Sequence, residues 1–152
     1  MFYTHNINES ARLAVWHITE PEDFFKKIYI PVREISHPHK RLQHLAGRFL
    51  LQILDPAFPV NDIRLDGRRP YLTDNSWYFS ISHCGDFAAA ILSRKCPVGI
   101  DVELVTEKLD LLEKKFLNEN EQQIIRNSDS VMTLRQRLTS FWSAKESMFK
   151  WY

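Results

Sequence analysis

The chain has 152 residues, of which 44% are hydrophobic. That length and composition suffice for one buried core and differ from those of disordered or collagen-like chains. Its 20 basic and 19 acidic residues leave a formal net charge of +1, which disfavours a generally basic nucleic-acid-binding protein.

The number of cysteines and the N-terminal sequence indicate the cellular compartment of the protein. Cys84 and Cys96 are too few for a disulfide framework or a thiolate metal site. The opening MFYTHNINES lacks the basic and apolar regions of a secretory signal, and no apolar run is long enough to span a bilayer. We therefore expect a soluble protein of the reducing cytoplasm with no membrane partner.

The first elements predicted are a strand and two helices. RLAVWHI (12–18) is rich in β-formers, and the TEPE that follows places Thr19 three residues before Glu22, a capping box for a short helix. A long helix is predicted from about residues 36–38 to a point before Pro56, because apolar residues recur there with helical spacing. The buried stripe of this helix comprises Leu42, Leu45, Ala46, Phe49, Leu50, Ile53 and Leu54.

The opposite side of the long helix carries basic residues. They are His37, Arg41, His44 and Arg48, with Lys40 beside them. Two interpretations stay open: a solvated helix surface, or a row of donors for an anionic group such as phosphate.

The middle of the chain predicts a loop and then strands. Residues 56–77 hold the glycine, proline and Asx residues typical of loops. WYFSISH (77–83) and FAAAILS (87–93) predict an antiparallel hairpin around a short CGD turn. PVGIDVELV (97–105) predicts a further strand.

The remainder of the chain predicts helices. NENE (118–121) is a plausible N-terminal capping box. A long helix is expected from about Ser130 to the end of the chain. Its inward residues would be Val131, Leu134, Leu138 and Phe141.

Two short segments carry charged residues that could support chemistry. In GIDVE, Asp101 and Glu103 are two residues apart and would share one face of a strand, while Ile100 and Val102 pack inward. Taken alone, this pattern also fits an edge strand with two solvated acids.

In FWSAKES, Glu146 and Lys150 are four residues apart on a helix and can pair, with Lys145 projecting about 100° around the axis. Taken alone, this fits an ordinary surface salt bridge. Together, the two segments would supply three carboxylates for Mg²⁺ and two lysines for phosphate oxygens, an arrangement suited to phosphoryl-type transfer.

The same residues carry a family resemblance. VGIDVE (98–103) and FWSAKESMFK (141–150) closely resemble the two defining motifs of 4′-phosphopantetheinyl transferases, of the larger surfactin-synthetase-activator type. FSISHCGDFAAAIL (79–92) resembles the family's Ser-His motif, and GRRPYL (67–72) its Gly-Lys-Pro-Tyr segment. Four motifs in the right order make the resemblance specific.

The resemblance implies an enzyme that moves the phosphopantetheine arm of coenzyme A to a serine of an apo acyl or peptidyl carrier protein, releasing 3′,5′-adenosine bisphosphate. Asp101, Glu103 and Glu146 would hold Mg²⁺, with Mn²⁺ a possible substitute. Glu146 would act as the base, Lys150 would stabilise the diphosphate, and Lys145 would contact a phosphate.

Further implied contacts involve the nucleotide end of coenzyme A. Ser82 and His83 correspond to contacts with its 3′-phosphate, and Arg69 stands where many relatives have lysine. Arg41 and His44 are the expected contributions of the long basic helix to the same phosphate.

The implied fold is α+β, with two similar halves related by a pseudo-twofold axis. By resemblance, residues 1–95 form the first half and 96–152 part of the second. Relatives continue past the last motif with further strands, whereas only Trp151 and Tyr152 follow Lys150 here. We therefore expect the second half to be incomplete, and a protein ending at Tyr152 to be poorly stable or self-associating.

Two other functions are considered. A non-catalytic domain of the same fold could bind coenzyme A or a carrier protein, although a pure binder has no need of Asp101, Glu103, Glu146 and Lys150 together. A nucleic-acid module using the basic helix with Arg68 and Arg69 is disfavoured by the near-neutral charge and the acidic trio.

Overall fold

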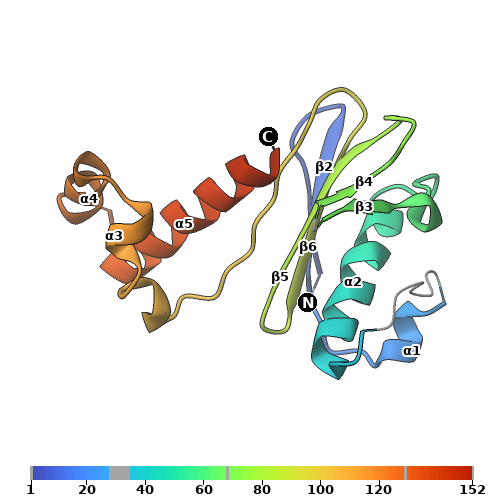
Figure 1. The fold of residues 1–152 in the computed structure, drawn as a ribbon, viewed down its shortest axis with the longest axis horizontal. Helices are drawn as coiled ribbons and strands as arrows, with labels where there is room; N and C mark the ends of the chain where they lie inside the picture. Colours follow the sequence, from blue (N-terminus) through green and yellow to red (C-terminus); the bar gives the residue numbers. More distant parts are fainter. Residues whose placement is uncertain (1, 28–34, 68, 129, 152) are drawn as a thin grey trace.

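The computed structural model describes residues 2–27, 35–67, 69–128 and 130–151. The fold is α+β, as the resemblance implied, and is built on a four-stranded antiparallel sheet with helices on both of its sides (Figure 1). The strands lie in the order β1-β2-β6-β5, with bounds β1 (Phe2–Asn6), β2 (Ala11–His17), β5 (Tyr78–Cys84) and β6 (Phe87–Ser93). The early strand and the hairpin are confirmed.

The remaining elements are short, apart from two long helices. Before the hairpin come α1 (Glu22–Phe25), α2 (Pro38–Leu54), η1 (Val60–Asp62), β3 (Arg64–Asp66) and β4 (Arg69–Tyr71). After it come η2 (Glu107–Leu109), α3 (Glu113–Phe116), α4 (Glu119–Arg126) and α5 (Leu134–Trp151). Strands β3 and β4 pair within the segment predicted as a loop. Among the described helices, none is both long and apolar enough to cross a membrane.

Helix α2 covers one face of the sheet and makes the main core. Its predicted apolar stripe is confirmed with one exception: Ile53 is 42% exposed, because it lies outside the surface that packs on the sheet. The predicted capping box of α1 is wrong, since Pro21 is the N-cap and no side chain caps the helix. The Glu22 carboxylate instead pairs with Arg41 and Lys26.

The other face of the sheet is covered by residues 97–103. Val98, Ile100 and Val102 pack against Ala89 and Ile91 of β6, which is therefore buried on both faces. The prediction of a strand over 97–105 is wrong, because this segment crosses the face of the sheet and pairs with no strand. The Ile100 amide donates to the Ser80 hydroxyl at 3.3 Å in place of a ladder hydrogen bond. The expected alternation of inward and outward side chains is nevertheless confirmed.

The C-terminal helices form a small second core of Leu117, Ile125 and Leu138. Asn118 and Glu121 make the predicted capping box of α4.

Helix α5 starts at Leu134, later than predicted. The Thr133 hydroxyl accepts from the Gln136 amide at 3.3 Å, and the Gln136 side chain accepts from the Thr133 amide at 2.8 Å, so a capping box begins the helix there. Val131 and Leu134 are accordingly exposed, contrary to prediction, whereas Leu138 is buried.

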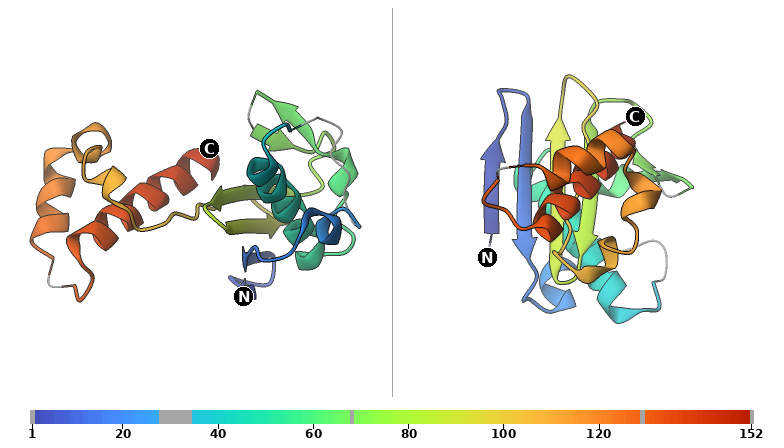
Figure 2. Two further views of the ribbon diagram at one scale, coloured as in Figure 1. Left: turned by 90° about the horizontal axis from the view of Figure 1, so that it is seen from below. Right: turned by 90° about the vertical axis from the view of Figure 1, so that its left-hand side faces the viewer.

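Helix α5 runs back toward the sheet, so that its C-terminal end lies close to the sheet and its N-terminal end far from it (Figures 1 and 2). The last turns of α5 thereby meet residues 97–103 and the end of β5. The division at residues 95 and 96, and the pseudo-twofold relation between the halves, stay predictions.

Candidate active site

Three side chains from distant parts of the chain meet at the end of α5. The Lys150 ammonium lies 2.6 Å from Asp101 Oδ1 and 3.0 Å from Ser82 Oγ, and the Ser82 hydroxyl donates to the same Asp101 oxygen at 2.8 Å. Ser82 comes from β5, Asp101 from the segment that crosses the sheet, and Lys150 from α5. The sequence predicted all three as site residues, and the fold brings them into one hydrogen-bonded cluster.

The Asp101 carboxylate is deeply buried, with a side chain only 4% exposed. Its second oxygen accepts from the Ser143 hydroxyl at 3.0 Å, so three donors surround this one carboxylate. Lys150 therefore pairs with Asp101, and not with Glu146, the partner that the four-residue spacing predicted. A buried carboxylate needs such compensation, because burial without a counter-charge strongly disfavours the ionised form.

Gly99 allows α5 to approach this closely. A Cβ atom on Gly99 would collide with the backbone carbonyl oxygen of Ser147 and would lie 2.9 Å from the backbone nitrogen of Trp151. The helix backbone therefore rests directly on the crossing segment, two residues before Asp101. This contact fixes the distance over which Lys150 reaches the carboxylate.

Glu103 shares the face of Asp101 but has different partners. Its two oxygens accept from the Trp142 indole at 3.2 Å and the Cys84 thiol at 3.1 Å. Burial raises the pKa of the Cys84 thiol, and the hydrogen bond to the Glu103 carboxylate raises it further, so Cys84 stays a neutral donor. Glu103 thus helps to fix the crossing segment to both β5 and α5.

Glu146 lines a cleft of about 1150 Å³ at the end of α5. Lys150 and Arg69 line the same cleft, together with Ser80 of β5 and aromatic residues that include Tyr78 and Phe149. The cleft thus combines two carboxylates, Glu146 and Asp66, and two basic residues with largely apolar walls, which is typical of a site for an organic ligand.

The three predicted metal ligands differ in their surroundings. Among the described residues, no group of three histidine, cysteine, aspartate or glutamate side chains is arranged to hold a metal ion. Carboxylate oxygens are the donors that Mg²⁺ prefers, so the chemistry of the set fits the ion. The arrangement does not, because the Lys150 ammonium occupies Asp101 Oδ1 and Glu103 is bound to Trp142 and Cys84.

Lys145 lies apart from the cluster. Its ammonium donates to the Phe116 carbonyl oxygen at 2.6 Å and to the Glu121 carboxylate at 2.7 Å. Lys145 lowers the pKa of Glu121, the residue that also closes the capping box of α4. These contacts tie α3 and α4 to α5, and the predicted contact between Lys145 and a phosphate stays a prediction.

The basic residues of α2 do not form the continuous exposed row that their spacing suggested. His37 caps the helix, and Arg48 is buried with 5% exposure. The Arg41 guanidinium bonds Glu22 at 2.7 Å and the Ile35 carbonyl oxygen at 2.7 Å. The solvated-surface interpretation fails for Arg48, and the predicted phosphate contacts of Arg41 and His44 stay untested. Arg68, named with this face, lies outside the described residues.

His83 follows Ser82 at the exposed end of β5. Desolvation by the surrounding protein lowers the pKa of His83, and the positive charges of the nearby Lys150 and Lys40 lower it further. The lowered pKa favours the neutral form of the His83 imidazole.

The lowered pKa of His83 can be tested by measuring how stability depends on pH. Because the folded state holds the proton of His83 less tightly than the unfolded state, protonation from about pH 6.5 downward favours unfolding. We expect the melting temperature of wild type to fall slightly more than that of His83→Gln between about pH 7.5 and 5. Parallel thermal melts measure this, and equal slopes would contradict the assignment.

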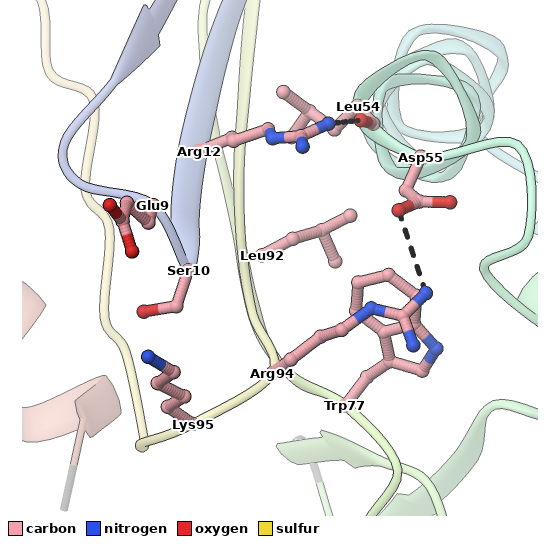
Figure 3. A pocket seen from close by; sticks show the side chains of 9 residues that line it. All are labelled: Glu9, Ser10, Arg12, Leu54, Asp55, Trp77, Leu92, Arg94 and Lys95. Atoms are coloured by element: carbon pink, nitrogen blue, oxygen red, sulfur yellow. Dashed lines mark hydrogen bonds and ion pairs between the residues drawn. The ribbon is translucent and has the colours of Figure 1, made fainter.

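A second, smaller cavity of about 170 Å³ lies at the C-terminal end of α2 (Figure 3). The Arg94 guanidinium lies over the Trp77 ring at 3.7 Å and 3.6 Å from Asp55, while Arg12 donates to the Leu54 carbonyl oxygen at 3.4 Å. Cations stabilise the C-terminal end of a helix, so these contacts have a structural explanation. None of the predicted site residues lines this cavity.

Three residues of the site were not assigned a role from sequence. Gly99, Cys84 and Ser143 all lie inside the quoted motifs but act through tertiary contacts. Ser143 carried a detectable signal, because it precedes Lys150 by two helical turns and so shares its face. Gly99 carried a weaker signal, as a glycine within an apolar extended run.

The C-terminal part of the chain is similar to a known protein family. Residues 97–152 match the family model of the 4′-phosphopantetheinyl transferase superfamily. This stretch contains Asp101, Glu103 and the whole of α5. The family resemblance of the motifs is thus confirmed, whereas the surfactin-synthetase-activator type stays a prediction.

Individual relatives give a closer comparison. The chain is 31% identical over 118 residues to enterobactin synthase component D of Salmonella typhi, covering 73% of this chain and 47% of the relative. It is 32% identical over 114 residues to enterobactin synthase component D of Escherichia coli strain K12, covering 73% of this chain and 54% of the relative. The chain spans about half the length of these curated relatives.

Proposed function

We propose that this protein transfers the 4′-phosphopantetheine arm of coenzyme A to a serine hydroxyl of an apo acyl or peptidyl carrier protein. The observation that carries the proposal is the convergence of Ser82, Asp101 and Lys150 beside the cleft that Glu146 lines. The match of residues 97–152 to the family model of the superfamily supports the same reaction class.

The proposed reaction is a phosphoryl-type displacement. The carrier serine oxygen forms a bond to the phosphorus that bears the pantetheine arm, while the bond from that phosphorus to the bridging oxygen breaks. The leaving 3′,5′-adenosine bisphosphate takes the electron pair of that bond. Glu146 accepts the serine proton, directly or through a water molecule, because it is a carboxylate on the cleft wall. Lys150, on the same wall, stabilises the negative charge that builds on the leaving phosphate.

Other residues would bind the nucleotide end of coenzyme A. Arg69 lines the cleft and is proposed to contact a phosphate or the base. Ser82 and His83 at the end of β5 are proposed to bind the 3′-phosphate, together with Arg41 and His44 of α2. Lys145 is a further candidate, provided that it leaves its contacts with α3 and α4.

We also propose that the transfer depends on Mg²⁺, with Mn²⁺ as a substitute. Asp101, Glu103 and Glu146 are the candidate ligands, because carboxylates are the only hard anionic ligands in the two motifs. Their arrangement in the described structure does not form a metal site, so no step of the reaction is assigned to the metal.

The proposed setting is the cytoplasm, where coenzyme A and carrier proteins are the partners and neither nucleic acid nor membrane takes part. The near-neutral net charge supports the exclusion of nucleic acid. The type of enzyme that we propose is the surfactin-synthetase-activator type, on the strength of the four motifs.

The direct test is to incubate the full-length protein with apo carrier protein, coenzyme A and Mg²⁺ and to weigh the carrier. We expect the carrier to gain the mass of one phosphopantetheine group. We expect Glu146→Ala to slow this gain by about 100-fold or more, because it removes the proposed base.

The matched control is Glu119→Ala, which removes an exposed carboxylate of α4 outside the cleft. It should react at the wild-type rate. Modification by Glu146→Ala at the wild-type rate would contradict the role of Glu146. Binding of coenzyme A without any gain in carrier mass would favour the alternative, a non-catalytic coenzyme A or carrier-protein binding domain.

A further inference from the structure

We infer that Ser143 of α5 is a positioning residue, which holds the Asp101 carboxylate in the orientation that keeps the Lys150 ammonium at the wall of the cleft. The inference rests on the proposed function, which assigns Lys150 to the leaving phosphate, and goes beyond it by giving Ser143 a role. Ser143 is not among the described residues that line the cleft, so it acts through Asp101.

The orientation of the Asp101 carboxylate depends on its hydrogen bonds. The torsion that turns an aspartate carboxylate is soft, so the side chain alone does not fix where each oxygen points. Lys150 at 2.6 Å and Ser82 at 2.8 Å both contact Oδ1. Oδ2 accepts from Ser143 at 3.0 Å and has no other partner among the described residues. The Ser143 hydroxyl is therefore the contact that opposes rotation of the carboxylate and keeps Oδ1 toward Lys150.

Helix α5 contacts this carboxylate from two positions. Ser143 and Lys150 are seven residues apart, so they lie on one face of the helix, about 10 Å apart along its axis. Helical side chains lean toward the N-terminus, so the long Lys150 side chain reaches back toward Ser143 to meet Asp101. The ammonium can follow the carboxylate when it turns, because its stem is flexible, whereas the short serine side chain cannot. Removal of the Ser143 hydroxyl would thus release the carboxylate and the ammonium together.

The place of the ammonium matters for the proposed reaction. Lys150 and Glu146, the proposed base, are one helical turn apart and line the same cleft. A cation stabilises a leaving phosphate only where it meets the charge that develops in the transition state. We therefore expect loss of the Ser143 hydroxyl to slow the transfer itself more than it weakens the binding of coenzyme A.

The first measurement is the rate of carrier modification by the full-length protein over a range of coenzyme A concentrations. We expect Ser143→Ala to lower kcat about tenfold and to change KM for coenzyme A by less than about twofold. Ser143→Thr keeps the hydroxyl and should restore most of kcat. The matched control is Ser140→Ala, which removes an exposed hydroxyl of the same helix that bonds the Gln136 carbonyl oxygen at 2.9 Å. It should react at the wild-type rate.

The second measurement follows the Lys150 amine itself, without coenzyme A or carrier protein. Acetic anhydride acetylates lysine amines that are free of their partners, and peptide mass spectrometry gives the rate at each lysine. Relative to the exposed Lys114 of α3, we expect Lys150 to react about tenfold faster in Ser143→Ala than in wild type. Lys145 of the same helix, which is bound to Phe116 and Glu121, should keep its wild-type rate.

An unchanged acetylation rate at Lys150, an unchanged kcat in Ser143→Ala, or a loss of kcat that Ser143→Thr does not restore would overturn the inference. Equal rises at Lys150 and Lys145 would also overturn it, because they would show that the hydroxyl stabilises α5 as a whole. A failure of the proposed function has a different signature. Wild type would then add no mass to the carrier, while the acetylation rates would still report whether Ser143 holds Lys150 in place.

Discussion

Replacing Lys150 by methionine should destabilise the metal-free protein by about 3–5 kcal/mol, the usual cost of leaving a buried charge without its partner. The side chain of Asp101 is 4% exposed and loses its only cationic contact in the described structure. The two hydroxyl donors, Ser82 and Ser143, remain but carry no charge. Urea denaturation followed by circular dichroism measures the difference.

The double variant Asp101→Asn with Lys150→Met is the control for this prediction. It removes both charges at once, so it should recover a large part of the stability lost by the single lysine variant. A single variant that is as stable as wild type, or a double variant that is no better than the single one, would show that the pair is not a buried interaction of this kind.

Replacing Gly99 by alanine should have the second large effect. The new Cβ atom would meet the Ser147 carbonyl oxygen and the Trp151 amide, which are backbone atoms that cannot swing aside as a side chain can. Helix α5 would have to shift away from the crossing segment, at a cost of about 3 kcal/mol, the upper end of the usual range for overpacking. The shift would also separate Lys150 from Asp101, so the transfer activity should fall together with stability.

A glycine elsewhere provides the comparison for Gly99. Gly67 has a φ of +57° and nothing within 4 Å of an added Cβ atom, so Gly67→Ala meets backbone strain of about 1 kcal/mol but no collision. We expect it to keep the transfer activity. Denaturant melts and the carrier-mass assay on both variants measure the contrast, and a Gly99→Ala protein with wild-type activity would refute the packing argument.

Local patterns in the sequence predicted those elements that local forces determine. The apolar stripe of α2, the β5–β6 hairpin and the Asn118–Glu121 capping box all follow from spacing along a few turns or strand residues. The start of α5 is also determined by a local interaction, because the residues of the Thr133–Gln136 capping box are visible in the sequence. The apolar Val131 favours an earlier start, but the capping box determines where the helix begins.

Tertiary contacts decided the features that the sequence could not predict. Residues 97–105 have the composition of a strand, yet they cross the face of the sheet, and only the position of β6 determines this. In the same way, the four-residue spacing predicted Glu146 as the partner of Lys150, whereas the buried Asp101 is a closer and stronger counter-ion. Family motifs identified the site residues, but not which of them touch.

Strand β6 separates α2 from the segment that carries Asp101 and Glu103. Ala88 and Ala90 face the helix with the basic residues, while Ala89 faces the segment that carries the acids. Because Ala88, Ala89 and Ala90 are all small, both layers pack close to the backbone of β6. A larger side chain at Ala89 would therefore displace the acidic segment alone, and one at Ala88 or Ala90 would displace α2 alone, so the position of each layer can be changed independently of the other.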